Sequence, residues 1–443
     1  MGFIRGEARE QVSLFPATLD ELIPEDHACR VIEAFVNRLE MARLGFVRSE
    51  PAETGRPGYD PRDLLKLYLY GYMQQVRSSR RLEAECTRNV EVMWLLGRLR
   101  PDYKSIAEFR RMHLAAVTEA GAELVQLARA AGLVKGEWVA IDGSKFRAVS
   151  SASRVRERDA MKRYLEQLDA ADEQEEVVID HDAAKAALEK LRRDPEPDAT
   201  FMRGWEGKLP AYNVQIAVDA ERGLIVAQQV TTEKNDLRSL LPMAEAARKA
   251  VAGERATLNV VADAGYSSGE QVQACEERGL VPHLPVQRTL NNQGDGELFG
   301  REQFQYQAAS DTYRCPAGQS LQRRNNCTDR PAVIYAAEAR VCGICPLKAR
   351  CTGSGKRIVK RHLYEDGLER TRQRTTPATM ALRKSLAEHP FALLKYRIFG
   401  HPRFLLRNLR GARIEIGLGI LALNLKRMMK MLGGKALAVA IAG

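Results

Sequence analysis

In the stretch VVADAGYSSGEQV, residues 260–272, the acid Asp263 comes directly after an apolar run and directly before Ala264-Gly265-Tyr266. The apolar run begins at Leu258, and a short run of this kind is typical of a buried β-strand. An acid at the end of such a strand belongs either to an ordinary polar turn or to a metal-binding set of carboxylates. The second interpretation needs partner acids in a matching context elsewhere in the chain.

One partner acid follows another short β-type run. Residues 137–142, Glu-Trp-Val-Ala-Ile-Asp, end on Asp142, which is followed by a small residue. If the two strands are neighbours in one sheet, Asp142 and Asp263 come together and repel unless a cation binds. Hard oxygen ligands suit Mg²⁺. Two such ions can support an in-line phosphoryl transfer, and Mn²⁺ can replace them.

A third carboxylate is expected on a nearby helix, and Glu388 is the best candidate. It lies in an amphipathic, basic stretch, and Lys395, seven positions later, falls two turns on along the same helix face. Asp219 and Asp236 have plainer interpretations, as a hairpin-turn residue and as a helix N-cap.

The pattern along the chain predicts an α/β protein. A helical region occupies about residues 1–130. A mixed sheet with flanking helices follows over about 131–290, interrupted by a charge-rich helical insert at 147–205, and it contains a hairpin formed by 212–219 and 224–232. Residues 291–370 form a cysteine-containing, β-rich insertion, and helices return over 371–443. Within the first region, Asp60-Pro61 predicts a helix start, and Ser105 with Glu108 predicts a capping box.

Charge is concentrated in the last third of the chain. The formal net charge is +11, and residues 346–430 hold 20 Lys and Arg against 5 Asp and Glu. A basic segment of this kind favours a polyanionic partner, with nucleic acid first, over basicity that serves only solubility. No signal core or membrane-spanning run is present, which predicts a cytoplasmic protein without disulfides.

The helical N-terminal region has two interpretations. Short helices with arginines between them fit a helix-turn-helix-like DNA-binding region, whereas a helical dimerisation or packing domain explains them equally well. The candidate phosphate contacts here and in the basic segment are Arg80, Arg81, Arg110, Arg111, Lys145, Lys384, Lys395, Arg397, Arg403 and Arg407.

Four cysteines of the insertion form a candidate zinc set: Cys315, Cys342, Cys345 and Cys351. The two-residue spacing of the middle pair suits two thiolates on one ion. Unliganded reduced cysteines stay an equal alternative, and Cys327 could replace one member. The other three, at 29, 86 and 275, lie on apolar helix faces and are expected in the core.

Seven fragments, in order, resemble a known family: 55–61, 140–145, 197–202, 212–219, 262–266, 388–395 and 424–427. The chain is similar over nearly its whole length to DDE-class bacterial insertion-sequence transposases with a ribonuclease-H-like catalytic core, closest to the group called insertion sequence eleven-eighty-two. The resemblance implies that Asp142, Asp263 and Glu388 form the catalytic triad, with double-stranded transposon-end and target DNA as substrates. Because two ends must meet, a homodimer is expected.

One departure concerns the third acid. Related transposases carry Tyr-x2-Arg-x3-Glu-x6-Lys there. Here Glu388 and Lys395 match, but Ala381 and Lys384 replace the Tyr and Arg, with Arg383 adjacent. This leaves open how the terminal phosphate is handled and whether cleavage passes through a DNA hairpin. A catalytically inactive DNA-binding relative and a hydrolytic nuclease of the same fold remain alternatives.

Overall fold

The computed structural model describes residues 18–50, 57–172, 181–204, 207–251, 257–285, 298–327 and 331–442. The chain forms two compact units. Unit 1 comprises Met1–Lys135, Gly143–Lys234 and Leu386–Gly443, and unit 2 comprises Gly136–Asp142 and Asn235–Ser385. These units regroup the expected spans, because the N-terminal helices and the last helices belong to the same unit. Strand β1 (Trp138–Arg147) and helix α14 (Pro377–Leu393) each contribute residues to both units.

Unit 1 begins with short helices, as the N-terminal pattern predicts. The expected start at Asp60-Pro61 is confirmed, since the Asp60 side chain accepts a hydrogen bond from the Arg62 N–H at 2.8 Å. The predicted capping box is wrong, because the helix begins two residues earlier and Asp102 caps it by accepting from the N–H groups of 104 and 105. The helices are α1 (Ala28–Arg38), α2 (Pro61–Met73), α3 (Ser79–Arg88), α4 (Val90–Leu95), α5 (Tyr103–Met112) and α6 (Leu114–Ala130).

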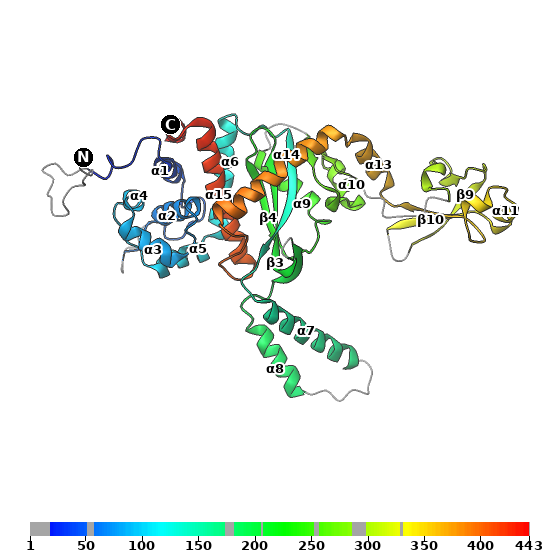
Figure 1. The fold of residues 1–443 in the computed structure, drawn as a ribbon, viewed down its shortest axis with the longest axis horizontal. Coiled ribbons are helices and arrows are strands. Elements are labelled where there is room, and N and C mark those ends of the chain that lie inside the picture. Colours follow the sequence, from blue (N-terminus) through cyan, green and yellow to red (C-terminus); the bar gives the residue numbers. More distant parts are fainter. Residues whose placement is uncertain are drawn as a thin grey trace, which may run out of the picture. The chain divides into compact units, whose positions relative to one another are not determined.

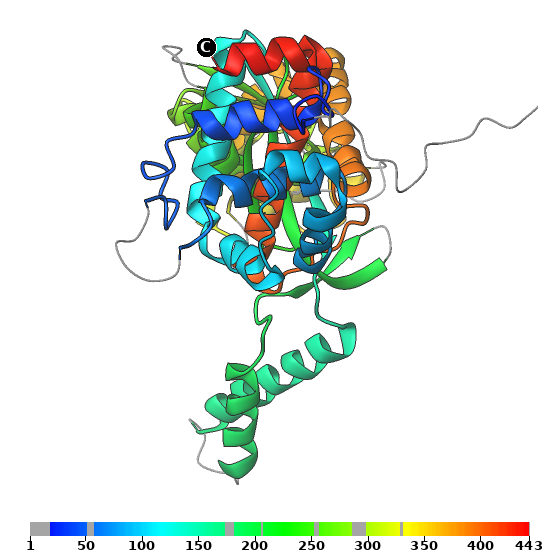
Figure 2. The same ribbon diagram turned by 90° about the vertical axis from the view of Figure 1, so that its left-hand side faces the viewer.

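A long helix near the C-terminus, α15 (Asn408–Leu432), is buried along most of its length and contacts α1, α2, α5 and α6. Glu415 is fully buried and accepts a hydrogen bond from the Arg77 guanidinium at 2.9 Å. Removing one partner of such a buried pair costs about 3–5 kcal/mol. The following helix, α16 (Gly434–Ala442), packs beside α1 (Figure 2). None of the described helices is long and apolar enough to cross a membrane.

The β-strands of unit 1 surround the predicted hairpin, which is confirmed. Strand β3 (Gly207–Asp219) pairs antiparallel with β4 (Ile225–Thr231), and the turn uses Gly223 at φ +68°. The side chain of Asn424 on α15 bonds both the N–H and the C=O of Ile225. A strand that the sequence analysis missed, β2 (Thr200–Gly204), pairs antiparallel with the start of β3, whose other neighbour is β1.

The charge-rich insert of unit 1 is helical, as expected. It consists of α7 (Ala152–Asp172) and α8 (His181–Arg192), which lie side by side (Figure 1). Lys190 and Glu157 form an ion pair between the two helices at 3.7 Å.

In unit 2, the first half of β1 pairs parallel with β5 (Leu258–Val261), which pairs parallel with β6 (Leu280–His283). Helix α9 (Leu240–Val251) precedes β5, and α10 (Gly269–Glu277) connects β5 to β6. The order antiparallel hairpin, β1, then two parallel strands with intervening helices is the mixed sheet that a ribonuclease-H-like core requires. The α/β fold class is therefore confirmed.

The cysteine-containing insertion of unit 2 is a separate antiparallel sheet in the order β11-β10-β9-β8-β7, seen at β9 and β10 in Figure 1. Its small apolar core includes Tyr313, Leu321, Tyr335 and Val359. The strands and helices are β7 (Gln305–Gln307), β8 (Thr312–Arg314), β9 (Ser320–Asn326), β10 (Ala332–Ala336), β11 (Ile358–His362), α11 (Ala339–Gly343) and α12 (Lys348–Cys351), followed by α13 (Glu365–Arg374).

Candidate active site

Asp142 and Asp263 lie at the same edge of the unit 2 sheet. Strands β1 and β5 are parallel, and Ala140 is in register with Val261. Each aspartate follows its paired residue by two positions, so the two residues are neighbours across the β1–β5 pair. Only Asp263 follows the end of its strand; the strand end that the sequence predicts at Asp142 is wrong, because β1 continues to Arg147. The apolar residues before them are fully buried, which fixes the strands in the core. The two acids that the sequence singles out are thus neighbours in space.

A cation from the chain bridges these two carboxylates. The Arg383 guanidinium lies 3.0 Å from Asp142 Oδ1 and 3.5 Å from Asp263 Oδ2. The Arg383 and Asp142 side chains are 17% and 14% exposed, whereas that of Asp263 is 42% exposed. Because two close carboxylates repel, a positive charge between them stabilises the pair. The bridge marks the place where a bound cation is favoured.

The backbone after β5 holds the Asp263 carboxylate in place. Asp263 caps a 3-10 helix, Ala264–Tyr266, and its Oδ1 accepts a hydrogen bond from the Gly265 N–H at 2.8 Å. A Cβ atom on residue 265 would lie only 2.9 Å from the same oxygen. A side chain at this position would therefore displace the carboxylate, which explains the glycine.

Tyr266 ends the 3-10 turn that follows Asp263, and its side chain is fully buried. Burial raises the pKa of Tyr266 well above its usual value, and the charges of Asp236, Asp142 and Asp263 raise it further. The phenol therefore stays protonated and available as a hydrogen-bond donor. Its full burial favours a packing role for this side chain.

Asp236 differs from its expected role as a helix cap. Helix α9 begins at Leu240, and Asn235 instead accepts a hydrogen bond from the Leu237 N–H at 3.3 Å. An Asp236 carboxylate oxygen lies 3.9 Å from the position that a Cβ on Gly265 would take. A third carboxylate of unit 2 thus neighbours the acid pair. The sequence analysis gave it only the role of a helix N-cap.

Glu388 and Lys395 lie on and just after α14. Glu388 is exposed and follows Arg383 on this helix by five residues. It belongs to unit 1 and the two aspartates belong to unit 2, so its place in the triad stays a prediction. The helix contains Pro390 and continues into a π-helical turn, Leu394–Ile398. Such turns occur frequently at functional sites. Lys395 Nζ lies over the Phe146 ring, 5.6 Å from its centroid.

Most of the predicted phosphate contacts lie at the surface of their units. Arg110 differs: it is only 4% exposed and donates a hydrogen bond to the Arg77 carbonyl at 3.0 Å. Its charged end packs inside the N-terminal helices, so it is not available to DNA there. Lys145 is half-buried. The exposed members are Arg80, Arg81, Arg111, Lys384, Arg397, Arg403 and Arg407.

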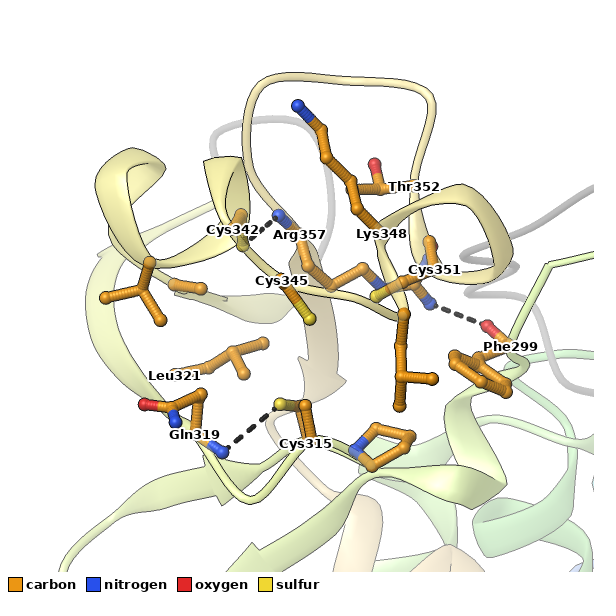
Figure 3. A pocket seen from close by; sticks show the side chains of 15 residues that line it. Phe299, Cys315, Gln319, Leu321, Cys342, Cys345, Lys348, Cys351, Thr352 and Arg357 are labelled. Atoms are coloured by element: carbon orange, nitrogen blue, oxygen red, sulfur yellow. Dashed lines mark hydrogen bonds between the residues drawn. The ribbon is translucent and has the colours of Figure 1, made fainter.

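The cysteines divide as expected into core and insertion. Cys29, Cys86 and Cys275 are buried, which confirms their assignment to the core. The four candidate zinc ligands at 315, 342, 345 and 351 are half-buried and line one cavity of about 30 Å³ (Figure 3). The cluster mixes two distant segments, which the spacing alone could not establish.

One further group of metal-ligating side chains was not anticipated. Donor atoms of His27, Cys29 and Glu91 lie within 4.8 Å of one another. His27 Nδ1 accepts from the Cys29 N–H, and Tyr70 donates to the Glu91 carboxylate at 2.7 Å. Burial raises the pKa of the Cys29 thiol to about 12. These hydrogen bonds explain the group as a polar network at the start of α1.

Comparison with known proteins gives the family. Residues 17–112 match the model described as Transposase domain (DUF772), and residues 173–425 match the model described as Transposase DDE domain. The second match includes Asp263 and Glu388 and begins after Asp142. No curated protein matches the chain.

Among solved structures, a piggyBac transposase synaptic complex with hairpin DNA is similar at 10% identity and a TM-score of 0.32, over 94% of this chain and 78% of that one. A likeness at that score carries no argument about function. The match to the DDE model alone covers more than half of the chain. The protein therefore belongs to the transposase DDE domain family and is a DNA transposase, an enzyme of metal-dependent DNA cleavage and transfer.

Proposed function

We propose that this transposase cleaves the ends of its element to expose 3′-hydroxyl groups and joins those hydroxyls to target DNA. The observation that carries the proposal is the pair of neighbouring aspartates, Asp142 on β1 and Asp263 after β5, bridged by Arg383 in unit 2. Adjacent carboxylate oxygens are the ligands that Mg²⁺ prefers. The residues present therefore fit a divalent-ion site.

Asp142, Asp263 and Glu388 would hold two Mg²⁺ ions, with Mn²⁺ as an accepted substitute. Such ions activate the attacking hydroxyl and stabilise the leaving oxygen in an in-line phosphoryl transfer. Asp142 and Asp263 contribute fixed geometry, because buried strands deliver both carboxylates and the Gly265 N–H orients one of them. Glu388 on α14 is the proposed third ligand.

Arg383 would act as a positioning residue that changes partners. Without metal, its positive charge neutralises the two aspartates and holds their carboxylates close to each other. Because the guanidinium contacts the oxygens that would hold the metal, Arg383 would leave the aspartates when the site is loaded. A free guanidinium on this helix can then neutralise a DNA phosphate, for which its planar donors are well suited.

The exposed basic residues of unit 1 are the proposed DNA-binding surface of that unit. Phosphate contacts from lysine and arginine supply affinity and register, while they carry no base sequence. Arg397, Arg403 and Arg407 are exposed near the start of α15, and Lys395 lies on the π-helical turn. A homodimer would bring two element ends together.

Strand cleavage and joining on DNA that carries the element ends tests this proposal. Asp263→Ala and Asp142→Ala are compared with Asp182→Ala, which removes an exposed aspartate of the charged insert. We expect the first two variants to lose cleavage by about 10³-fold or more, because each removes a metal ligand, while Asp182→Ala keeps wild-type activity.

Three outcomes would overturn parts of the proposal. Equal cleavage by wild type and Asp263→Ala would remove the triad assignment. Cleavage without joined products, when both ends and target are present, would identify a hydrolytic nuclease. DNA binding by wild type without any cleavage would identify an inactive relative. Glu388→Gln, read with the same assay, separates the role of the third acid from that of the pair.

A further inference from the structure

The β-rich insertion brings four cysteines from two separate segments around one cavity. Cys315 follows β8, whereas Cys342, Cys345 and Cys351 lie on or between the two short helices after β10. All four line the same space of about 30 Å³, and Figure 3 shows them surrounding it. Within the described residues, no three of these sulfurs lie within 4.8 Å of one another. A tetrahedral zinc site needs sulfur separations of about 3.8 Å, so binding requires a small closure.

Backbone amides already point at two of the sulfurs. The Gln319 N–H donates to Cys315 Sγ at 3.3 Å, and the Arg357 N–H donates to Cys342 Sγ at 3.5 Å. A sulfur that accepts such bonds is a better anion than an isolated thiol, because the donors stabilise negative charge. The loops are therefore arranged for thiolates and not only for packed thiols.

Arg357 supplies the independent observation. It lines the same cavity and is only 1% exposed. Its guanidinium donates to two neutral carbonyls, of Cys351 at 2.9 Å and of Phe299 at 3.0 Å, and its Nε has no hydrogen-bond partner. In the part of the chain that the structure describes, no carboxylate pairs with it. A buried cation without an anion destabilises the folded protein. A negatively charged group in this cavity would therefore be favoured.

We propose that Cys315, Cys342, Cys345 and Cys351 bind one structural Zn²⁺ as a tetrathiolate, with Arg357 as its buried counter-cation. One Zn²⁺ replaces four thiol protons, which pass to solvent, and the resulting centre carries two negative charges. Arg357 and the two N–H donors offset that charge. The site is distinct from the acid pair, and it does not depend on the proposed reaction.

The size of the insertion explains why it needs the ion. Among its described residues, the apolar cluster at its centre has seven buried members, namely Phe304, Tyr313, Leu321, Val333, Tyr335, Ala337 and Val359. A core this small supplies little net stability, and small domains commonly add a metal or disulfides. Closed four-ligand zinc sites contribute folding free energy directly. The zinc centre would therefore hold the cysteine loops against the sheet.

Metal content of the full-length chain tests the proposal. The protein is produced with zinc in the medium, purified without chelator and analysed for metal. We expect about one zinc per chain in the wild type and at least tenfold less in Cys345→Ser and in Cys315→Ser, roughly the loss that a missing ligand causes. Cys327→Ser is the matched control, because Cys327 lies in the same insertion but does not line the cavity. It should keep its zinc, as should a variant carrying both Asp142→Ala and Asp263→Ala.

A titration of metal-free wild type with Co²⁺ covers the case in which a cysteine variant does not fold. Tetrahedral cobalt thiolates absorb strongly in the visible and near ultraviolet, and Zn²⁺ should abolish that signal by displacement. Wild type that neither carries zinc nor gives the cobalt thiolate spectrum would overturn the site. Equal zinc in wild type and Cys345→Ser would overturn it as well.

Discussion

Unit 2 holds two clusters of side chains that can bind metal, and the two clusters differ in how their charge is balanced. The acid pair is bridged by the Arg383 guanidinium, within 3.0 and 3.5 Å of its oxygens. In the cysteine cluster, the buried arginine donates its side-chain hydrogen bonds to carbonyl groups. Carboxylates are charged at neutral pH, so two close ones repel unless a cation lies between them. Thiols are neutral until a metal displaces their protons. A catalytic centre that exchanges ions would therefore be charged before metal binds, whereas a structural centre that keeps one ion would become charged only on binding.

The pH dependence of metal binding sharpens this comparison most. Burial raises the pKa of Cys351, Arg357 opposes that shift, and the charges of the neighbouring cysteines add to it. Its thiol must lose a proton to bind zinc, so affinity rises with pH below the thiol pKa. We expect zinc affinity to rise about 100-fold between pH 6 and pH 8 for each proton released.

Mg²⁺ affinity at the acid pair, which holds no thiol, is measured over the same interval as the comparison. Calorimetric titrations in buffers with different ionisation enthalpies measure both affinities and proton release. Zinc binding without proton release would contradict the thiol assignment.

A change at Gly265 should break the acid site while leaving the cysteine cluster intact. In Gly265→Ala, the new Cβ meets Asp263 Oδ1 at 2.9 Å, so the carboxylate must move. Displacement of a reacting group by about 1 Å costs on the order of 100-fold in rate. We therefore expect a loss of cleavage of that size, with zinc content unchanged.

Gly121→Ala in α6 is the control for this substitution, because nothing lies within 4 Å of a Cβ there. It should keep wild-type activity. Cleavage by Gly265→Ala at the wild-type rate would show that the exact place of Asp263 is unimportant.

Removing the bridging cation gives the smallest of these effects. In Arg383→Gln, divalent ions no longer compete with the guanidinium, so Mn²⁺ should bind to the acid pair more tightly, by about tenfold or 1.4 kcal/mol. Arg383→Lys retains the charge and should bind Mn²⁺ like the wild type. Mn²⁺ binding is read directly from its electron paramagnetic resonance signal. Weaker binding in Arg383→Gln would mean that Arg383 supports the metal site and does not compete with it.

Local patterns predicted the elements better than their partners. The short apolar runs before Asp142 and Asp263 and the period-two strands of the hairpin at Gly223 are local signals that do not depend on the rest of the fold, and they were predicted. Parallel pairing of β1 with β5 needed only the assumption that both strands share a sheet. The fold class followed from the order of these elements.

The sequence did not predict contacts between residues that lie far apart along the chain. Arg383 was read only as a neighbour of a motif position, because nothing local shows which acid a cation will meet. Arg110 resembled a surface arginine, since burial of its charge depends on the Arg77 carbonyl 33 residues away. Asp236 resembled a helix N-cap, and its proximity to Gly265 arises from packing between elements. Strand β2 lacks a clear alternation, and its pairing with β3 defines it.

The burial of α15 has a consequence for synthesis of the protein. Unit 1 combines residues before 136 with residues after 385, and α15 lies between the N-terminal helices and strand β4. During translation, the first helices and strand β4 therefore cannot complete their packing before α15 is made. Glu415 on this helix bonds to Arg77, and Asn424 bonds to Ile225. A transcript cut short before codon 408 would yield a chain unable to complete this core. Interrupted copies of the gene would then produce material for proteolysis in place of a competing DNA-binding fragment.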